Sequence, residues 1–200
     1  KLIGCAAIIL GGLSFNEKLK YLDYGLSLLK RIIKFTFDVE GFPKSRNIRQ
    51  LNFYLRYFIL IREWLKESQN EIPDYLNEII FLLGQAYSLI NKDLNASYFF
   101  NGNTNSDNLD LDNYFKRLGY TFKNESFEVG GYVFLNNKKL SFAMDLGPSP
   151  EKKFSDNYQA GTLSFEIISN GKKIISNSGY FQNYKHQLNL ISKNTACHNT

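Results

Sequence analysis

The sequence predicts an α+β protein in which antiparallel helices are followed by an antiparallel β-sandwich. Three observations support this class. Apolar residues recur at three- and four-residue steps over residues 1–118. Strict alternation replaces that period after about residue 128. The segment Ser169-Asn-Gly-Lys172 is a hairpin turn signal. We therefore expect a helical domain over residues 1–120 and a β domain over 125–200, with the boundary near Gly119–Glu128.

The helical half divides into segments separated by clear breaks. The apolar run Leu2–Leu13 is shorter than the roughly 20 residues of a membrane span, and we interpret it as a buried helix rather than a signal-peptide core. Pro43 ends the second segment, and Asp74 is a plausible N-cap of the fourth. Short polar turns between such helices favour an α/α bundle, toroid or solenoid. The further predicted helices are Asn16–Phe37, Asn47–Ser68, Tyr75–Asn91 and Leu109–Leu118.

The β half has period-two patterning interrupted by turn residues. Asn101–Asp107, which precedes the last helix, contains no large apolar residue, so we expect a loop there. Alternating or β-branched runs then predict four strands. Their expected bounds are Gly131–Leu135, Leu140–Asp145, Leu163–Ser169 and Lys172–Asn177.

Charge and cysteine content exclude some classes of protein. The net charge of +5 is spread evenly along the chain, whereas a nucleic-acid binder gathers its basic residues into a stripe. We therefore expect no nucleic-acid partner. Cys5 and Cys197 lie almost a chain length apart, so a disulfide framework is not expected. Because the chain begins with Lys1 and stops inside a motif at Thr200, we expect an internal fragment cut at both ends.

Two short motifs near the C-terminus carry most of the functional information. Tyr158–Glu166 reads YQAGTLSFE, and Asn194–Thr200 reads NTACHNT. Together they resemble the heparinase II/III-like family, in which a HAHAD- or HAGT-type segment leads into LSFE and a TAAHNT segment follows. Asp145-Leu-Gly-Pro148 and Ile175-Ser-Asn-Ser-Gly179 stand in the order and spacing of that family.

The resemblance implies an architecture and an activity. Residues 1–120 would be the end of an (α/α) toroid, and 125–200 the start of the β-sandwich. Characterised members are polysaccharide lyases that cleave uronate glycans by β-elimination. The expected partner is thus an acidic polysaccharide, and the expected location is the bacterial periplasm or cell envelope. Neither cofactor nor metal is expected, since His198 alone remains of a possible zinc set. The sequence does not indicate an oligomeric state.

β-Elimination requires a group that neutralises the substrate carboxylate, together with a base and an acid. On the resemblance, the loop Gly41–Asn47 lines the cleft. The catalytic candidates are His198, Tyr158 and Asn47, and the substrate-binding candidates are Arg46, Lys44, Gln159, Lys193 and Tyr180. Each of these candidate residues also has a structural alternative. Asn47 is equally suited to capping a helix, and a single His is commonly structural. Tyrosines also fill cores, and cations in loops are commonly solvated.

The chain also departs from the lyase pattern. Asn157 and Gln159 stand where some relatives carry paired histidines, and neither amide can act as a general base. Asn177 replaces an aspartate, Gly161 replaces the aspartate of one branch, and Gln50 lies where a tyrosine is common. These departures motivate an alternative from another class, a non-catalytic glycan-binding or envelope-assembly protein. A third interpretation is a helical scaffold without sugar recognition. The lyase interpretation needs Arg46, Tyr158 and His198 to converge on one groove.

Overall fold

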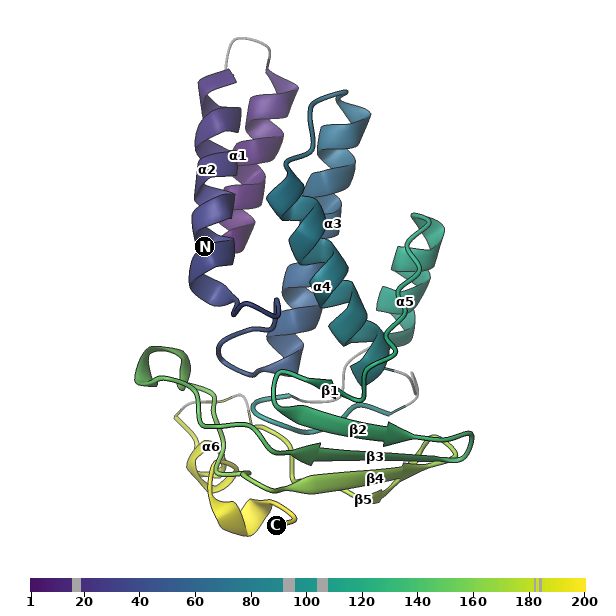
Figure 1. Ribbon diagram of the computed structural model, residues 1–200. Coiled ribbons are helices and arrows are strands. Elements are labelled where there is room, and N and C mark those ends of the chain that lie inside the picture. Colours follow the sequence, from purple (N-terminus) through teal and green to yellow (C-terminus); the bar gives the residue numbers. More distant parts are fainter. Residues whose placement is uncertain (16–18, 92–95, 104–107, 182, 184) are drawn as a thin grey trace.

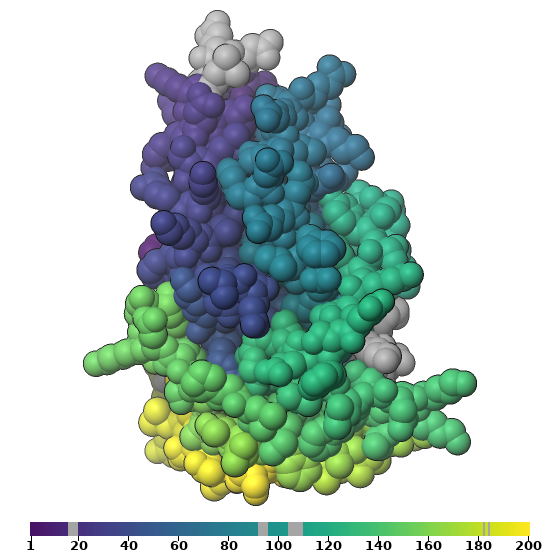
Figure 2. All heavy atoms as spheres, in the orientation of Figure 1, coloured from purple at the N-terminus to yellow at the C-terminus, as the bar shows by residue number. Residues whose placement is uncertain are grey.

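The computed structural model describes residues 1–15, 19–91, 96–103, 108–181, 183 and 185–200. Helices form an elongated bundle that stands on one face of a sheet, and the C-terminal segment lies against the sheet at the opposite end of the molecule (Figure 1). The space-filling view shows the strands and the C-terminal residues closing the lower end (Figure 2). The predicted α+β class is confirmed.

The helical part consists of two hairpins and a shorter fifth helix. Helices α1 and α2 pair along their lengths, α3 pairs with α4, and α1 also packs against α3. The bounds are α1 Leu2–Ser14, α2 Leu19–Thr36, α3 Ile48–Glu67, α4 Asp74–Ile90 and α5 Asn108–Arg117. They agree with the sequence prediction to within a few residues, although 16–18 at the predicted start of α2 lie outside the described residues.

The apolar stripes seen in the sequence are the buried faces of these helices. In α3, Leu51, Leu55 and Phe58 have no exposed surface, as expected for positions three and four apart. One detail of the prediction is wrong. Pro73 occupies the N-cap position of α4 and Asp74 is the first helical residue, without a side-chain cap hydrogen bond. There its charge complements the helix dipole instead.

The strands form one antiparallel sheet in the order β1-β2-β3-β4-β5. Asn170 and Gly171 both have positive φ, 48° and 74°, as a two-residue hairpin turn of type I′ requires. In the part of the chain that the structure describes, these strands make one layer of the predicted sandwich. Their bounds are β1 Glu128–Val129, β2 Tyr132–Asn136, β3 Leu140–Asp145, β4 Phe165–Ser169 and β5 Lys172–Ile175.

Strand β4 starts two residues later than predicted because of its backbone. Leu163 has φ +64°, a left-handed conformation that cannot continue a strand. Phe165 then donates its backbone N–H to the carbonyl of Asn199, 3.0 Å away. The start of β4 is therefore hydrogen-bonded to the C-terminal segment, which also contains α6 Gln187–Ile191.

Helices and sheet meet through the loop between α2 and α3. Phe42 is fully buried and contacts Tyr132 of β2, with ring centroids 6.0 Å apart. A Cβ on Gly130 would overlap the Phe42 ring, and Gly130 has φ +57°, so this position requires glycine. One buried apolar cluster runs from the helices into the sheet. The division at residues 120–125 stays a prediction, although α5 ends at Arg117 and the first strand begins at Glu128.

Replacing Phe42 by alanine tests this junction. We expect Phe42→Ala to lower the free energy of unfolding by about 3–5 kcal/mol, because it removes a fully buried ring at the helix–sheet contact. The matched control is Phe81→Ala, whose ring is 60% exposed and is expected to change stability by about 0.5 kcal/mol or less. Urea denaturation followed by circular dichroism measures both. Equal losses of unfolding free energy in the two variants would contradict the role of Phe42 in the helix–sheet contact.

Candidate active site

A buried ion pair joins the interhelical loop to the sheet. The Nη2 atom of Arg46 lies 2.6 Å from Oδ1 of Asp145 at the end of β3, and the two side chains are 8% and 1% exposed. Nε and Nη2 also donate to the carbonyls of Gly130 and Gly131, at 3.0 and 3.2 Å, and Nη1 donates to Pro148 at 3.1 Å. The guanidinium lies 4.5 Å from the centroid of the Tyr132 ring. The buried positive charge of Arg46 is thus paired with a carboxylate, and its N–H groups are hydrogen-bonded to backbone carbonyls.

Asp145 is satisfied from a second side as well. Its Oδ2 accepts a hydrogen bond from Nδ2 of Asn101, 3.1 Å away, and Asn101 also contacts the hydroxyl of Tyr132. The hydroxyl of Tyr132 donates to the Arg46 carbonyl at 2.7 Å. Asn101 and Gly102 form a turn, as the predicted loop requires, and Asn101 is only 2% exposed. Residues 104–107 of that loop lie outside the described residues.

The predicted role of Arg46 in holding substrate is therefore corrected. Four of its N–H groups are donated to protein oxygens inside the junction. Burial alone would lower the pKa of Arg46, but Tyr132 and Asp145 together outweigh it, and the pKa lies above its ordinary value. The residue is a permanently charged structural link. Sequence reasoning missed its partner Asp145, although a lone carboxylate ending an apolar strand was the available signal.

Asn47 caps a helix. Its Oδ1 accepts the backbone N–H of Gln50 at 3.2 Å, which makes it the N-cap of α3, and its side chain is 4% exposed. This is the structural alternative that the sequence left open. Its Nδ2 faces Gly102, where an added Cβ would lie 2.7 Å away. The catalytic role predicted for Asn47 is corrected to a positioning role for the start of α3.

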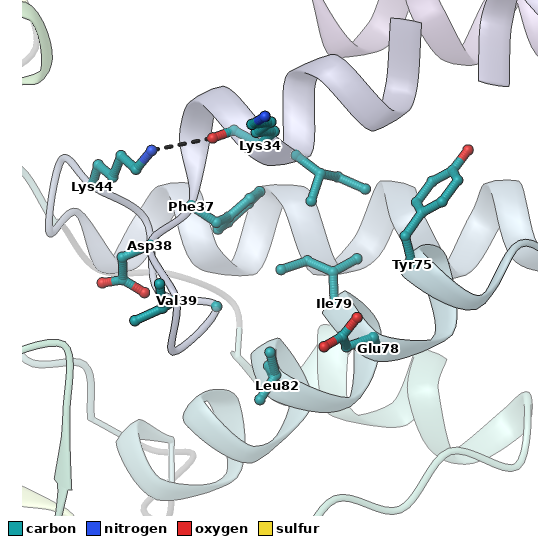
Figure 3. Close-up of a pocket in the computed structure, with 11 residues that line it drawn as sticks. Lys34, Phe37, Asp38, Val39, Lys44, Tyr75, Glu78, Ile79 and Leu82 are labelled. Carbon is teal, nitrogen blue, oxygen red and sulfur yellow. Dashed lines mark hydrogen bonds between the residues drawn. The ribbon is translucent and has the colours of Figure 1, made fainter. Parts of the chain in front are cut away.

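Lys44 belongs to a different surface. Its Nζ donates to the carbonyl of Lys34 at 3.1 Å and borders a groove between α2 and α4, of about 510 Å³, whose floor includes Phe37 and Ile79 (Figure 3). A second groove, of about 430 Å³, lies between the α2–α3 loop and the segment after β3, and Lys44 lines it together with Arg46 and Ser149. In the loop 41–47, Lys44 is thus the cation that lies outside the buried ion pair of Arg46.

Gln159 connects separate segments of the chain through buried hydrogen bonds. It is 1% exposed. Its Nε2 donates to the carbonyls of Gly179 and Ser192, at 2.9 and 2.8 Å, and its Oε1 accepts the N–H of Gly102 at 3.2 Å. Both ends of the amide are used, so its predicted contact with substrate is corrected. An amide suits this position because it donates and accepts at once.

Residues 156–164, on both sides of Gln159 in the chain, form a segment that we call the rim. The other candidate residues lie in this segment or contact it. The hydroxyl of Tyr158 accepts from Oγ of Ser149 at 3.3 Å and lies 3.5 Å from Oγ1 of Thr162. The Nζ of Lys193 donates to the Asp156 carbonyl at 2.8 Å, and Tyr180 donates to Oδ1 of Asn157 at 2.9 Å. Through Ser149, Tyr158 reaches the 430 Å³ groove that Lys44 lines.

His198 lies on the inner side of the same rim. A Cβ added at Gly161 would lie 3.5 Å from its Nδ1, at ordinary van der Waals distance, so the imidazole packs beside this glycine. Its Nε2 is buried without a hydrogen-bond partner among the residues that the structure describes. Burial lowers the pKa of His198 below the ordinary 6.5, with Asp145 opposing the shift. The imidazole is therefore neutral at neutral pH.

Glu166 positions the segment that carries His198. It has no exposed surface. Its Oε1 accepts the N–H groups of Phe99 and Asn177, both at 3.0 Å, and Lys173 lies 3.2 Å from Oε2. Asn177 in turn accepts the N–H of Asn199 at 3.0 Å through Oδ1. Burial raises the pKa of Glu166. Glu166 is thus a buried residue of β4, where it pairs with Ala143 of β3.

The structure brings the candidates together around Asp145 rather than in an open trench. Asp145 pairs with Arg46 and acts electrostatically on His198, and Tyr158 does so on Arg46. Of Arg46, Tyr158 and His198, Arg46 lines the groove beside Lys44, and Tyr158 contacts Ser149 in the lining of that groove. Within the described ranges no three His, Cys, Asp or Glu side chains are placed to hold a metal ion. Nor does any helix there have the length and apolar character to cross a bilayer.

Comparison with solved structures defines the class of this fold, a polysaccharide-lyase-like α+β architecture. A crystal structure of heparinase III superposes with a TM-score of 0.79 at 14% identity, over 100% of this chain and 38% of that chain. A mutant of heparan sulfate lyase HepC from Pedobacter heparinus gives 0.80 at 16% identity, over 100% and 36%. The chain spans little more than a third of these proteins.

The sequence comparison is more specific for the second half. Residues 121–200 match the family described as heparinase II/III-like, C-terminal. Comparison with curated proteins gives no match. The resemblance inferred from the two C-terminal motifs is thereby confirmed, and the rim and His198 both lie inside the matched residues.

The ion pair at the junction is tested by removing one partner. Asp145→Ala leaves Arg46 charged and buried, and we expect a loss of about 3–5 kcal/mol in the free energy of unfolding. Lys153→Ala breaks the solvent-exposed pair with Glu151 and is expected to leave the free energy of unfolding almost unchanged. Chemical denaturation compares them. A cost for Asp145→Ala as small as that of the control would refute the central role of the pair.

The low pKa of His198 predicts a pH dependence. Because the folded state favours the neutral imidazole, the stabilisation is complete above pH 6.5 and is lost as pH falls through the lowered pKa. The urea midpoint of the wild type should therefore drop more between about pH 7.5 and pH 5.5 than that of His198→Gln. Identical pH profiles would contradict the assignment. Proton NMR of both proteins, with His186→Asn to assign the second imidazole, supplies an independent titration.

Proposed function

We propose that this protein is a polysaccharide lyase that cleaves an acidic, uronate-containing glycan by β-elimination. The observation that carries the proposal is the neutral, half-buried imidazole of His198 on the inner side of the rim whose outer residue is Tyr158. The proposal is supported by the family match of the segment that contains both residues and by the fold of heparan sulfate lyase HepC. Its setting would be the bacterial periplasm or cell envelope.

Each step of the reaction has a candidate group. A base removes the proton on the carbon beside the carboxylate, and the electron pair forms a carbon–carbon double bond as the bond to the 4-linked oxygen breaks. An acid then protonates the leaving oxygen. The neutral imidazole of His198 suits the base, and the half-exposed phenol of Tyr158 suits the acid. We assign carboxylate neutralisation to Lys193, whose ammonium uses one donor on Asp156 and keeps two.

A second candidate function rests on Gln159. Its amide is consumed by three internal hydrogen bonds, so this position supplies no base, and Nε2 of His198 is covered. A protein with such a rim can bind an acidic glycan without cleaving it. The two functions differ in product: elimination creates an unsaturated uronate end, and binding alone leaves the glycan intact.

The test is a rise in ultraviolet absorbance when the protein is incubated with uronate polysaccharides. We expect His198→Ala and Tyr158→Phe each to lower kcat by roughly 10²–10⁴. His186→Asn, which keeps a capping side chain on α6, and Tyr24→Phe, on the exposed face of α2, are matched controls and should retain wild-type rates. Glycan binding without any absorbance change in the wild type would favour the binding function and refute elimination.

A further inference from the structure

A groove away from the rim combines cations with aromatic rings. It lies between α3 and α5, the helix that stands at the side of the bundle in Figure 1, and has a volume of about 730 Å³. Arginines and rings from both helices line it. Its cationic and aromatic members are Arg49, Arg56, Arg117, Phe53, Tyr57 and Tyr114.

The spacing on α3 creates this surface. Arg49, Phe53 and Arg56 are separated by four and three residues, so they share one face of the helix. That face is turned away from the core, because Leu51, Leu55 and Phe58 are the buried residues. Arg49, Phe53 and Arg56 are all exposed, so burial in the core does not explain the composition of this face.

The three arginines lack carboxylate partners, unlike the others that the structure pairs. Arg46 is bound to Asp145 and Arg62 to Glu63. No carboxylate of the described residues lies within ion-pair distance of Arg49, Arg56 or Arg117, which are exposed. Asp110 is the one acidic residue of the lining. The groove thus carries a local positive charge, although the charge of the whole chain is evenly spread.

Aromatic rings lie close to the arginines in this groove. The guanidinium carbons of Arg56 and Arg117 lie 5.8 and 5.9 Å from the centroid of Tyr114, so both flank one ring. On α3, Phe53 and Tyr57 have centroids 4.9 Å apart, and Phe53 is 39% exposed. An exposed aromatic platform between cations offers a flat apolar surface and paired N–H donors at once.

We propose that this groove is a second binding site for an acidic saccharide segment, with the arginines on its carboxylate or sulfate groups and Phe53 and Tyr114 against the sugar rings. Arginine binds such anions in a planar, two-point geometry. The volume is within the range of ligand sites. This proposal rests on the proposed function for the identity of the polymer. It assigns α3 and α5 the task of holding a part of the glycan remote from the cleaved bond.

A single-stranded nucleic acid is the other polymer that arginines and rings can bind. The observations favour the saccharide, because only three cations line the groove and no basic stripe extends it along the chain. A nucleic-acid track would need further cations beyond both ends. Preference for single-stranded DNA is therefore an outcome that overturns the proposal.

The experiment is isothermal titration calorimetry on the full chain. The probes are a heparin hexasaccharide, a galacturonate hexasaccharide and a deoxythymidine oligomer, each titrated into the His198→Ala background so that no cleavage occurs. We expect Arg56→Ala/Arg117→Ala to weaken binding of at least one saccharide by tenfold or more, and Phe53→Ala by about threefold. The control Arg31→Ala/Lys138→Ala removes two exposed cations elsewhere and should leave affinity within about twofold.

The outcomes separate this site from the lyase proposal. Loss of saccharide binding in Arg56→Ala/Arg117→Ala, with wild-type absorbance unchanged by any polysaccharide, would keep the groove and refute the lyase. Unchanged affinity in that variant, equal loss in the control, no saccharide binding by the parent protein, or tighter binding of the deoxythymidine oligomer would each overturn the groove. Because both arginines are exposed, thermal unfolding of the variants should match the parent and exclude a folding defect.

Discussion

The ion pair between Arg46 and Asp145 is the interaction on which the rest of the molecule depends. It connects the loop before α3 with the end of β3, and Asn101 and Tyr132 complete it from two further segments. A buried charge without its partner is costly, so each segment is held in one position relative to the others. The helices are therefore fixed relative to the sheet, with residues 41–47 packed between them. The same ion pair fixes the end of β3, which precedes the rim 156–164 in the chain.

The rim is held by amides and a carboxylate rather than by apolar packing. Gln159 ties it to Gly102, Gly179 and Ser192, and Glu166 ties the strand after it to the C-terminal segment. Polar groups that are buried and fully paired specify one arrangement more strictly than apolar contacts do. The residues that we propose for the chemistry are Tyr158, Lys193 and His198. These three side chains are partly exposed, whereas Gln159 and Glu166 are buried.

The sequence predicted the helices and strands well because their signals are local. The stripe of Leu51, Leu55 and Phe58 and the Asn170-Gly171 turn each follow from neighbours a few residues away. The site was harder to predict because its residues act across long sequence separations. Arg46 and Asp145 are 99 positions apart, and a loop arginine looks the same whether it is buried or solvated. Gln159 appeared as a lost histidine, whereas its amide is needed at both ends. His198 is a candidate because a motif marks it, and its role stays a prediction.

The central functional claim for this protein is the proposed β-elimination. Proton NMR of a uronate oligosaccharide incubated with the protein tests that claim most directly, since it identifies the bond changes and not only the loss of substrate. The account predicts a vinylic proton signal from an unsaturated uronate end with the wild type, and none with His198→Ala. Saturated ends on every product, or a vinylic signal that persists in His198→Ala, would contradict it.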